Sequence, residues 1–184
     1  TILDPDQAVA IMGEILQDMD LKLSPRDALR RLSLIKNGAS PSKELKESNI
    51  PPAVYEAYRD RLAQYRVLDY DDILLEVLQQ FESQAPETVS VKGKSPFTCL
   101  LVDEFQDTNY AQYSILQNLA RAHGNLYVVG DEDQSIYRWR GADYRNLDRF
   151  KSDFTNAEVI LLEQNYRSTQ IILDSAMSVI NQNL

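Results

Sequence analysis

The second half of the chain contains three short, uninterrupted runs of mostly apolar residues. They lie at residues 98–102, 126–129 and 159–162. Helical patterns separate these runs, and a last one, with Ser168 as its expected cap, follows the third run. Runs of this length without polar alternation are typical of strands that are buried on both faces of a parallel sheet. Strands that alternate with helices in this way predict an α/β fold with a doubly wound sheet.

The first 84 residues show helical patterns instead. Four amphipathic runs begin at capping residues or prolines, which are Asp4-Pro5, Ser24-Pro25, Pro51-Pro52 and the pair Asp69 and Asp72. Such residues mark helix starts. Gly38 is expected to end the second helix, and Ser40-Pro41 to open a further short one. We therefore predict an all-α subdomain over residues 1–86, a linker over 87–96 and an α/β part over 97–184.

Charge and composition narrow the class of protein. The 184 residues carry a formal net charge of −9, with 28 acidic and 19 basic side chains. This balance argues against a protein that coats nucleic acid, although it leaves room for a local basic groove. No apolar run approaches the ~20 residues of a membrane span. A single cysteine, Cys99, and the lack of a signal-peptide pattern predict a reducing, cytoplasmic setting with no membrane partner.

Polar residues follow each apolar run, at the sheet edge where ligands of α/β proteins bind. Asp103 and Glu104 follow the first run. Mg²⁺ takes one or two protein carboxylates together with phosphate oxygens, and a neighbouring carboxylate can orient or deprotonate a water molecule. The pair is therefore a candidate magnesium–nucleotide site. An equally weighted alternative is that Asp103 and Glu104 cap the helix that follows.

The second run leads into a segment that mixes an amide, aromatic rings and arginines. Gln134 is a neutral donor and acceptor, suited to sensing a terminal phosphate. Tyr137 and Trp139 alternate with Arg138 and Arg140, and such rings can stack on unpaired bases while arginines hold phosphates. The alternative is that the two rings belong to the core and that the arginines pair with local carboxylates.

Arg167 follows the third run, immediately before the predicted cap of the last helix. An arginine at this edge can reach a γ-phosphate and stabilise charge during phosphoryl transfer. The alternative for a single arginine is a surface salt bridge.

Together the three segments resemble the superfamily 1 DNA helicases of the UvrD, PcrA and Rep group. The resemblance lies in the sequences LLVDEFQDTN at 100–109, VVGDEDQSIYRWRGAD at 128–143 and LEQNYRS at 162–168, which are similar to that family's motifs II, III and IV in the same order. The helical half resembles the insertion subdomain of the first motor domain, with LDYDD at 68–72.

The resemblance implies roles for these residues. Asp103 would hold Mg²⁺, Glu104 would activate the hydrolytic water, Gln134 would couple the γ-phosphate of ATP to DNA, and Arg167 would act as an arginine finger. Tyr137, Trp139 and Arg140 would contact single-stranded DNA. Gln106 and Asp107 would belong to the nucleotide network, without a firm role.

One part of the family pattern is missing from the 184 residues. They contain no Gly-x-x-x-x-Gly-Lys-[Ser/Thr] phosphate loop, and Thr88 stands where the first loop glycine should precede Gly93-Lys94. We therefore expect a partial P-loop NTPase (RecA-like) parallel sheet that lacks its phosphate-loop strand, and a fragment that does not hydrolyse ATP alone. The resemblance implies that the missing strand lies between the second and third strands. The gap that it leaves should be closed by direct pairing, by detachment of the last strand or by another chain, with self-association as one outcome.

The resemblance thus implies a fragment of an ATP-dependent helicase or translocase, with 3′ to 5′ polarity, that acts on single-stranded DNA and duplex junctions in repair or replication. Its other partner would be the remainder of the helicase polypeptide. Two alternatives stay open, a nucleic-acid-binding or docking module without turnover, and the motor of a helicase–nuclease.

Overall fold

The structure is a computed structural model that describes residues 1–38, 43, 45–46, 48–83 and 97–182. These residues form two compact units, Thr1–Asp148 and Arg149–Leu184, and each is described by itself. The expected helix start at Ser40-Pro41 and the linker at 87–96 lie outside the described residues, and residues 43 and 45–46 are helical. Among the helices that are described, none has the length and apolarity needed to cross a membrane.

The first four described helices begin where capping residues and prolines predict. They are α1 (Pro5–Asp18), α2 (Pro25–Asn37), α4 (Pro52–Tyr65) and α5 (Tyr70–Ser83). The Asp4 carboxylate accepts a hydrogen bond from the backbone of Asp6 and forms a capping box with Gln7. Asp69 and Asp72 form a reciprocal cap at the start of α5, with N···O distances of 2.8 and 3.3 Å. These local bonds satisfy amide groups that a helix start leaves free.

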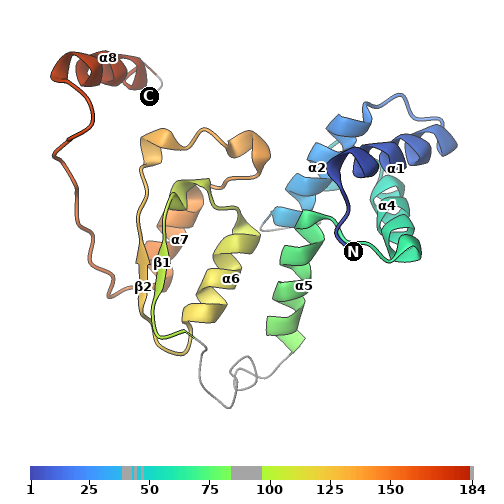
Figure 1. The fold of residues 1–184 in the computed structure, drawn as a ribbon, viewed down its shortest axis with the longest axis horizontal. Coiled ribbons are helices and arrows are strands. Elements are labelled where there is room, and N and C mark those ends of the chain that lie inside the picture. The colour runs from blue at the N-terminus through green and yellow to red at the C-terminus, as the bar shows by residue number, and fades with distance from the viewer. Residues whose placement is uncertain (39–42, 44, 47, 84–96, 183–184) are drawn as a thin grey trace. The chain divides into compact units, whose positions relative to one another are not determined.

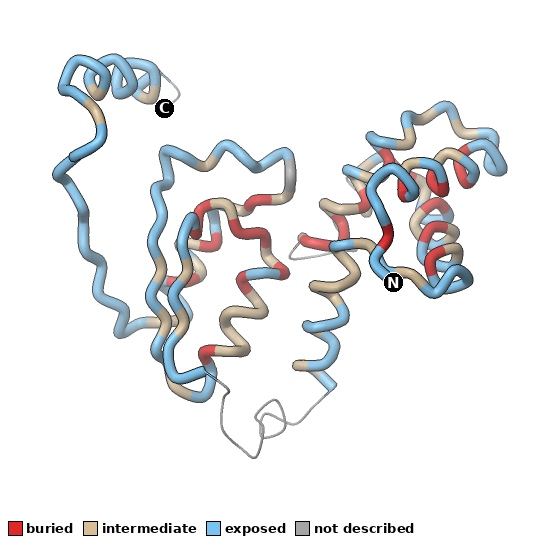
Figure 2. Tube along the Cα trace, in the orientation of Figure 1, coloured by how far each residue is buried: buried red, intermediate tan, exposed pale blue. Residues whose placement is uncertain are grey.

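The main hydrophobic core lies among α1, α2 and α4 (Figure 2). Its buried side chains all come from residues 1–62, and the largest are Met12, Ile15, Leu32, Val54 and Tyr58. The apolar positions of these helices recur at helical spacing, so each helix turns one stripe inward. The helical half therefore has a core of its own.

A buried ion cluster joins the end of α2 to the start of α5. The Lys36 ammonium donates hydrogen bonds to Asp69 Oδ2 at 2.7 Å and Asp72 Oδ1 at 2.6 Å. It also lies 5.3 Å from the centre of the Tyr58 ring. Burial acts to lower the pKa of Lys36, but the attraction and hydrogen bonds of Asp69 and Asp72 outweigh it and raise the pKa above its usual value.

The α/β part of the first unit contains a parallel sheet of two described strands. Strand β1 (Leu100–Val102) pairs with β2 (Leu126–Val128) in the register Leu100 with Leu126. Helix α6 (Tyr110–Ala120) connects them (Figure 1). The partial α/β sheet expected from the sequence is therefore confirmed. Burial on both faces is not, because Leu101 and Tyr127 are 76% and 55% exposed.

Helix α7 (Arg145–Asp153) begins in the first unit and ends in the second. Its Asn146 side chain, which is buried, donates hydrogen bonds to the backbone carbonyls of Thr108 and Asn109 at 2.9 and 3.1 Å. These bonds tie the first turn of α7 to the segment that follows β1.

The strand predicted at residues 159–162 does not form, and this prediction is wrong. The segment has no regular secondary structure, and its four apolar side chains are 64% to 81% exposed. A strand needs a neighbour to pair its backbone groups, and the described residues of the second unit form no strand. Helix α8 (Gln170–Ile180) follows, and its N-cap is Thr169 rather than the predicted Ser168.

Candidate active site

Asp103 and Glu104 lie at the carboxyl end of β1, and both are exposed. The backbone of Glu104 is left-handed, with φ 50° and ψ 43°, a conformation that costs a residue with a side chain about 1 kcal/mol or more. The Asp103 carboxylate accepts a hydrogen bond from the Glu104 amide at 3.0 Å and supports this turn. A strained residue at a strand end is typical of functional sites.

The alternative role of these two carboxylates as helix caps is wrong. Helix α6 is capped by Asn109, whose side-chain oxygen accepts a hydrogen bond from the backbone N–H of Gln112 at 2.8 Å. The two residues form a capping box. A short 3-10 helix, η1 (Phe105–Asp107), separates Glu104 from α6, and the Glu104 side chain makes no capping bond to it. Both carboxylates are therefore available for another purpose.

Gln106 connects the ends of the two strands. Its side-chain nitrogen donates to Glu104 Oε2 at 2.7 Å, and its side-chain oxygen accepts from the Asp131 amide at 3.0 Å. Asp131 follows β2 and Gly130, and its carboxylate accepts from Gln134 Nε2 at 2.7 Å. The family resemblance implies that Gln106 belongs to the nucleotide network, but it gives no firm role for this residue. Its bridging position depends on a contact across 25 residues, which no local pattern signals.

Glu104 and Gln134 are thus brought to one edge of the sheet. Gln134 ends a second 3-10 helix, η2 (Glu132–Gln134), which Asp131 caps by accepting a bond from the Asp133 amide at 3.1 Å. The carboxyl ends of parallel strands form the ligand edge of an α/β sheet. The first two predicted site segments therefore meet as expected from the strand order.

The donor set at this edge fits Mg²⁺ bound together with a phosphate. Asp103 supplies an exposed carboxylate, and Asp107 has a buried carboxylate oxygen for which no hydrogen-bond partner is present. Mg²⁺ prefers oxygen ligands and keeps several waters. Among the described residues no group of three or more acidic, histidine or cysteine side chains surrounds a single point. Protein atoms here would therefore supply only part of a coordination shell.

Tyr137 and Trp139 lie beyond η2, next to each other. Their ring centres are 6.4 Å apart with the planes tilted by 46°, and the side chains are 39% and 58% exposed. Trp139 lies in a third 3-10 helix, η3 (Arg138–Arg140). The alternative that both rings are core residues is wrong for this chain. The side chain of Arg140, the third predicted DNA contact, lies outside the described ones.

Arg167 belongs to the second unit, so no distance joins it to Glu104 or Gln134. It is exposed, and its backbone amide donates to Asn165 Oδ1 at 2.9 Å. The Ser168 amide donates to the same oxygen at 2.8 Å. This turn, rather than a strand end, presents the arginine.

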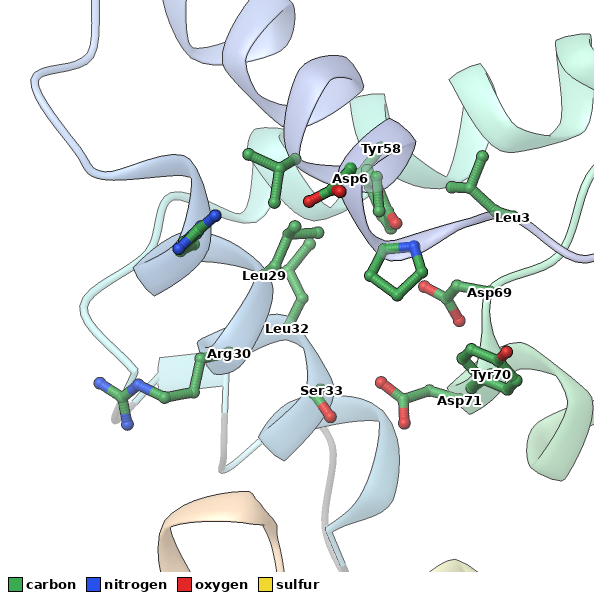
Figure 3. Close-up of a pocket in the computed structure, with 14 residues that line it drawn as sticks. Leu3, Asp6, Leu29, Arg30, Leu32, Ser33, Tyr58, Asp69, Tyr70 and Asp71 are labelled. Carbon is green, nitrogen blue, oxygen red and sulfur yellow. The ribbon is translucent and has the colours of Figure 1, made fainter.

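The first unit also contains a pocket of about 480 Å³ in its helical half (Figure 3). Side chains of α1 and α2, with Tyr58 and the start of α5, line it, and none of them is a predicted site residue. Burial, followed by the nearby Asp69 carboxylate, raises the pKa of Tyr58. The pocket is therefore separate from the chemistry at the strand ends.

Comparison with known proteins gives the family of the chain. The family model of the UvrD/REP helicase N-terminal domain matches residues 1–155. Proteins named ATP-dependent DNA helicase PcrA from Bacillus subtilis and Leuconostoc citreum are each 40% identical over the whole chain, and one from Staphylococcus epidermidis is 39% identical. The chain spans about a quarter of the length of these curated relatives, 26%, 25% and 26% respectively. On its sequence and its fold, the chain belongs to the UvrD/REP helicase family.

Proposed function

We propose that the chain is part of the first motor domain of an ATP-dependent DNA helicase. The observation that carries this proposal is the hydrogen-bonded connection from Glu104 through Gln106 and Asp131 to Gln134, at the carboxyl ends of two parallel strands. Within that domain, residues 1–86 would form the helical insertion subdomain, 87–96 a linker and 97–184 the later part of the ATP-binding fold. The names of the relatives support the same activity.

Each of the four predicted site residues would take one part in ATP hydrolysis. Asp103 would hold Mg²⁺, which supplies positive charge to the phosphate oxygens when bound. Glu104 orients the attacking water and accepts its proton. Gln134 contacts the terminal phosphate through its amide, and Arg167 stabilises charge that develops in the transition state.

The segment after η2, residues 137–140, would bind DNA. Tyr137 and Trp139 expose their rings, and an exposed ring can stack on an unpaired base whatever the sequence. Arg140 would hold a backbone phosphate beside them. The partner is single-stranded DNA, with duplex junctions as the substrate of unwinding in the 3′ to 5′ direction. The proposed helicase would act in DNA repair or replication, in the cytoplasm.

The 184-residue chain should be inactive by itself. Its sequence contains no phosphate loop, and the loop's backbone amides and lysine normally hold the phosphates in place. The test is an ATPase assay on this chain with and without single-stranded DNA. Turnover that DNA stimulates would contradict the proposal. Light scattering on the same sample checks whether the sheet edges lead to self-association, and a uniform monomer would speak against it.

The decisive experiment uses the complete polypeptide that contains this chain. Glu104→Gln should abolish ATP hydrolysis and leave nucleotide binding intact, because the amide keeps the side-chain shape but cannot accept a proton. Glu76→Gln on α5 is the matched control, and it should hydrolyse ATP normally. Normal turnover in the Glu104→Gln protein would refute the assignment of the general base.

A further inference from the structure

Gln106 is a buried amide between two exposed functional segments. It lies in η1 with 7% of its surface exposed, while Glu104 on one side and Gln134 on the other are exposed. A buried polar side chain is costly unless its hydrogen bonds are made. Both ends of the Gln106 amide are satisfied.

The two bonds allow only one orientation of this amide. The Asp131 backbone amide can only donate, so it requires the oxygen of Gln106, and the ionised Glu104 carboxylate can only accept, so it requires the nitrogen. A flipped amide would lose both bonds. A glutamate at this position would keep the bond to Asp131 but place a second negative charge beside Glu104.

The backbone at Gly130 passes close to Gln106. A Cβ atom at Gly130 would lie 2.8 Å from Gln106 Oε1 and 3.3 Å from the Gln106 amide nitrogen. The backbone at Gly130 therefore approaches Gln106 closely because it carries no side chain. The amide of Asp131, the next residue, can then reach the Gln106 oxygen.

We propose that Gln106 is a positioning residue that holds the Glu104 carboxylate and ties it to the loop of Asp131 and Gln134. A shift of that loop when Gln134 meets a phosphate would move the Gln106 amide, and with it the orientation of Glu104. This role rests on the proposed function, because it presupposes that Glu104 activates water and that Gln134 contacts the nucleotide.

The test measures ATP hydrolysis by the complete polypeptide, with and without single-stranded DNA. Gln106→Met should lower kcat by about 10- to 100-fold, as loss of a residue that orients a catalytic group does. The KM for ATP should change by less than about twofold, because Gln106 is not proposed to contact ATP itself. Gln112→Met is the matched control. It removes the side-chain oxygen that accepts a hydrogen bond from the Asn109 backbone in the capping box of α6, so it should lower thermal stability without lowering kcat.

A second experiment tests the hydrogen bond between Gln106 and Glu104 by thermal stability rather than by activity. Gln106→Glu alone should lower the melting temperature, because two carboxylates then face each other. The double change Glu104→Gln with Gln106→Glu should restore it, since the donor and acceptor are exchanged. Failure of this restoration would overturn the proposed contact.

The outcomes separate this inference from the function on which it rests. If Glu104→Gln abolishes hydrolysis but Gln106→Met is as active as Gln112→Met, the positioning role is refuted and the proposed function stands. If Glu104→Gln hydrolyses ATP normally, the assignment of Glu104 as the general base fails, and the positioning role of Gln106 fails with it. A drop in kcat for Gln106→Met, together with restored stability in the double variant, supports the role.

Discussion

Replacing Lys36 by methionine should destabilise the helical half strongly. Lys36 is 5% exposed, and its ammonium is held between the carboxylates of Asp69 and Asp72 at 2.7 and 2.6 Å. Methionine keeps most of the apolar stem but removes the charge. Two carboxylates that share a partly buried site are then left without a cation.

The magnitude follows from the burial of the three groups. Loss of one partner of a buried ion pair costs about 3–5 kcal/mol. The Asp69 and Asp72 side chains are 17% and 20% exposed, so water relieves part of the cost. We therefore expect the lower end of that range, a loss of about 3 kcal/mol in the free energy of unfolding.

The assay is urea unfolding of the 184-residue chain, followed by the helical signal in circular dichroism. Arg59→Met is the matched control, because Arg59 pairs with Asp60 at the surface, where both side chains are more than half exposed. The triple change of Lys36→Met with Asp69→Asn and Asp72→Asn should recover most of the loss, since no charge is left unpaired and asparagine can also cap α5. A loss for Lys36→Met no larger than that for Arg59→Met would refute the reasoning.

Three further predictions concern other parts of the chain. As pH rises above about 10, the free energy of unfolding should fall more in the native chain than in Lys36→Met. A lysine with a raised pKa stabilises the fold at pH values below its unfolded pKa, and this stabilisation is lost as the lysine deprotonates. An equal fall of the free energy of unfolding with pH in both proteins, measured by urea unfolding, would contradict this. Trp139→Ala in the complete polypeptide should weaken binding of a fluorescent single-stranded oligonucleotide by ~1–3 kcal/mol, while Tyr65→Ala should not, and an unchanged affinity would remove Trp139 from the DNA site. Gly13→Ala should stabilise α1 by about 0.5–1 kcal/mol, since the new methyl group would be 3.7 Å from Pro25, an ordinary contact; a lower urea midpoint would show otherwise.

Much of the fold could be predicted because its signals are local. The start of α1 depends on bonds between residues a few positions apart, as between Asp4 and Asp6, and α2 begins at Pro25, directly after Ser24. The strands that end at Val102 and Val128 also lie inside the predicted apolar runs. A cap or a strand end depends on few neighbours, so the residue types alone indicate it.

The third strand shows where such reasoning fails. Residues 159–162 have the composition of a buried strand, yet they are exposed and form no strand. A run of apolar residues indicates only that the segment prefers to be buried. Whether a strand forms depends on a neighbour with free backbone groups, which composition does not reveal.

The residues that join distant parts of the chain could be found only in the tertiary structure. Gln106 reaches Asp131 across 25 positions, and Lys36 reaches Asp69 across 33. By itself the sequence determined the starts of α1, α2, α4 and α5, the two strands and the family motifs, all of which are set by neighbouring residues. The packing of those elements decided which polar side chains were buried together, because a buried amide or ammonium must find its partner wherever the fold brings one.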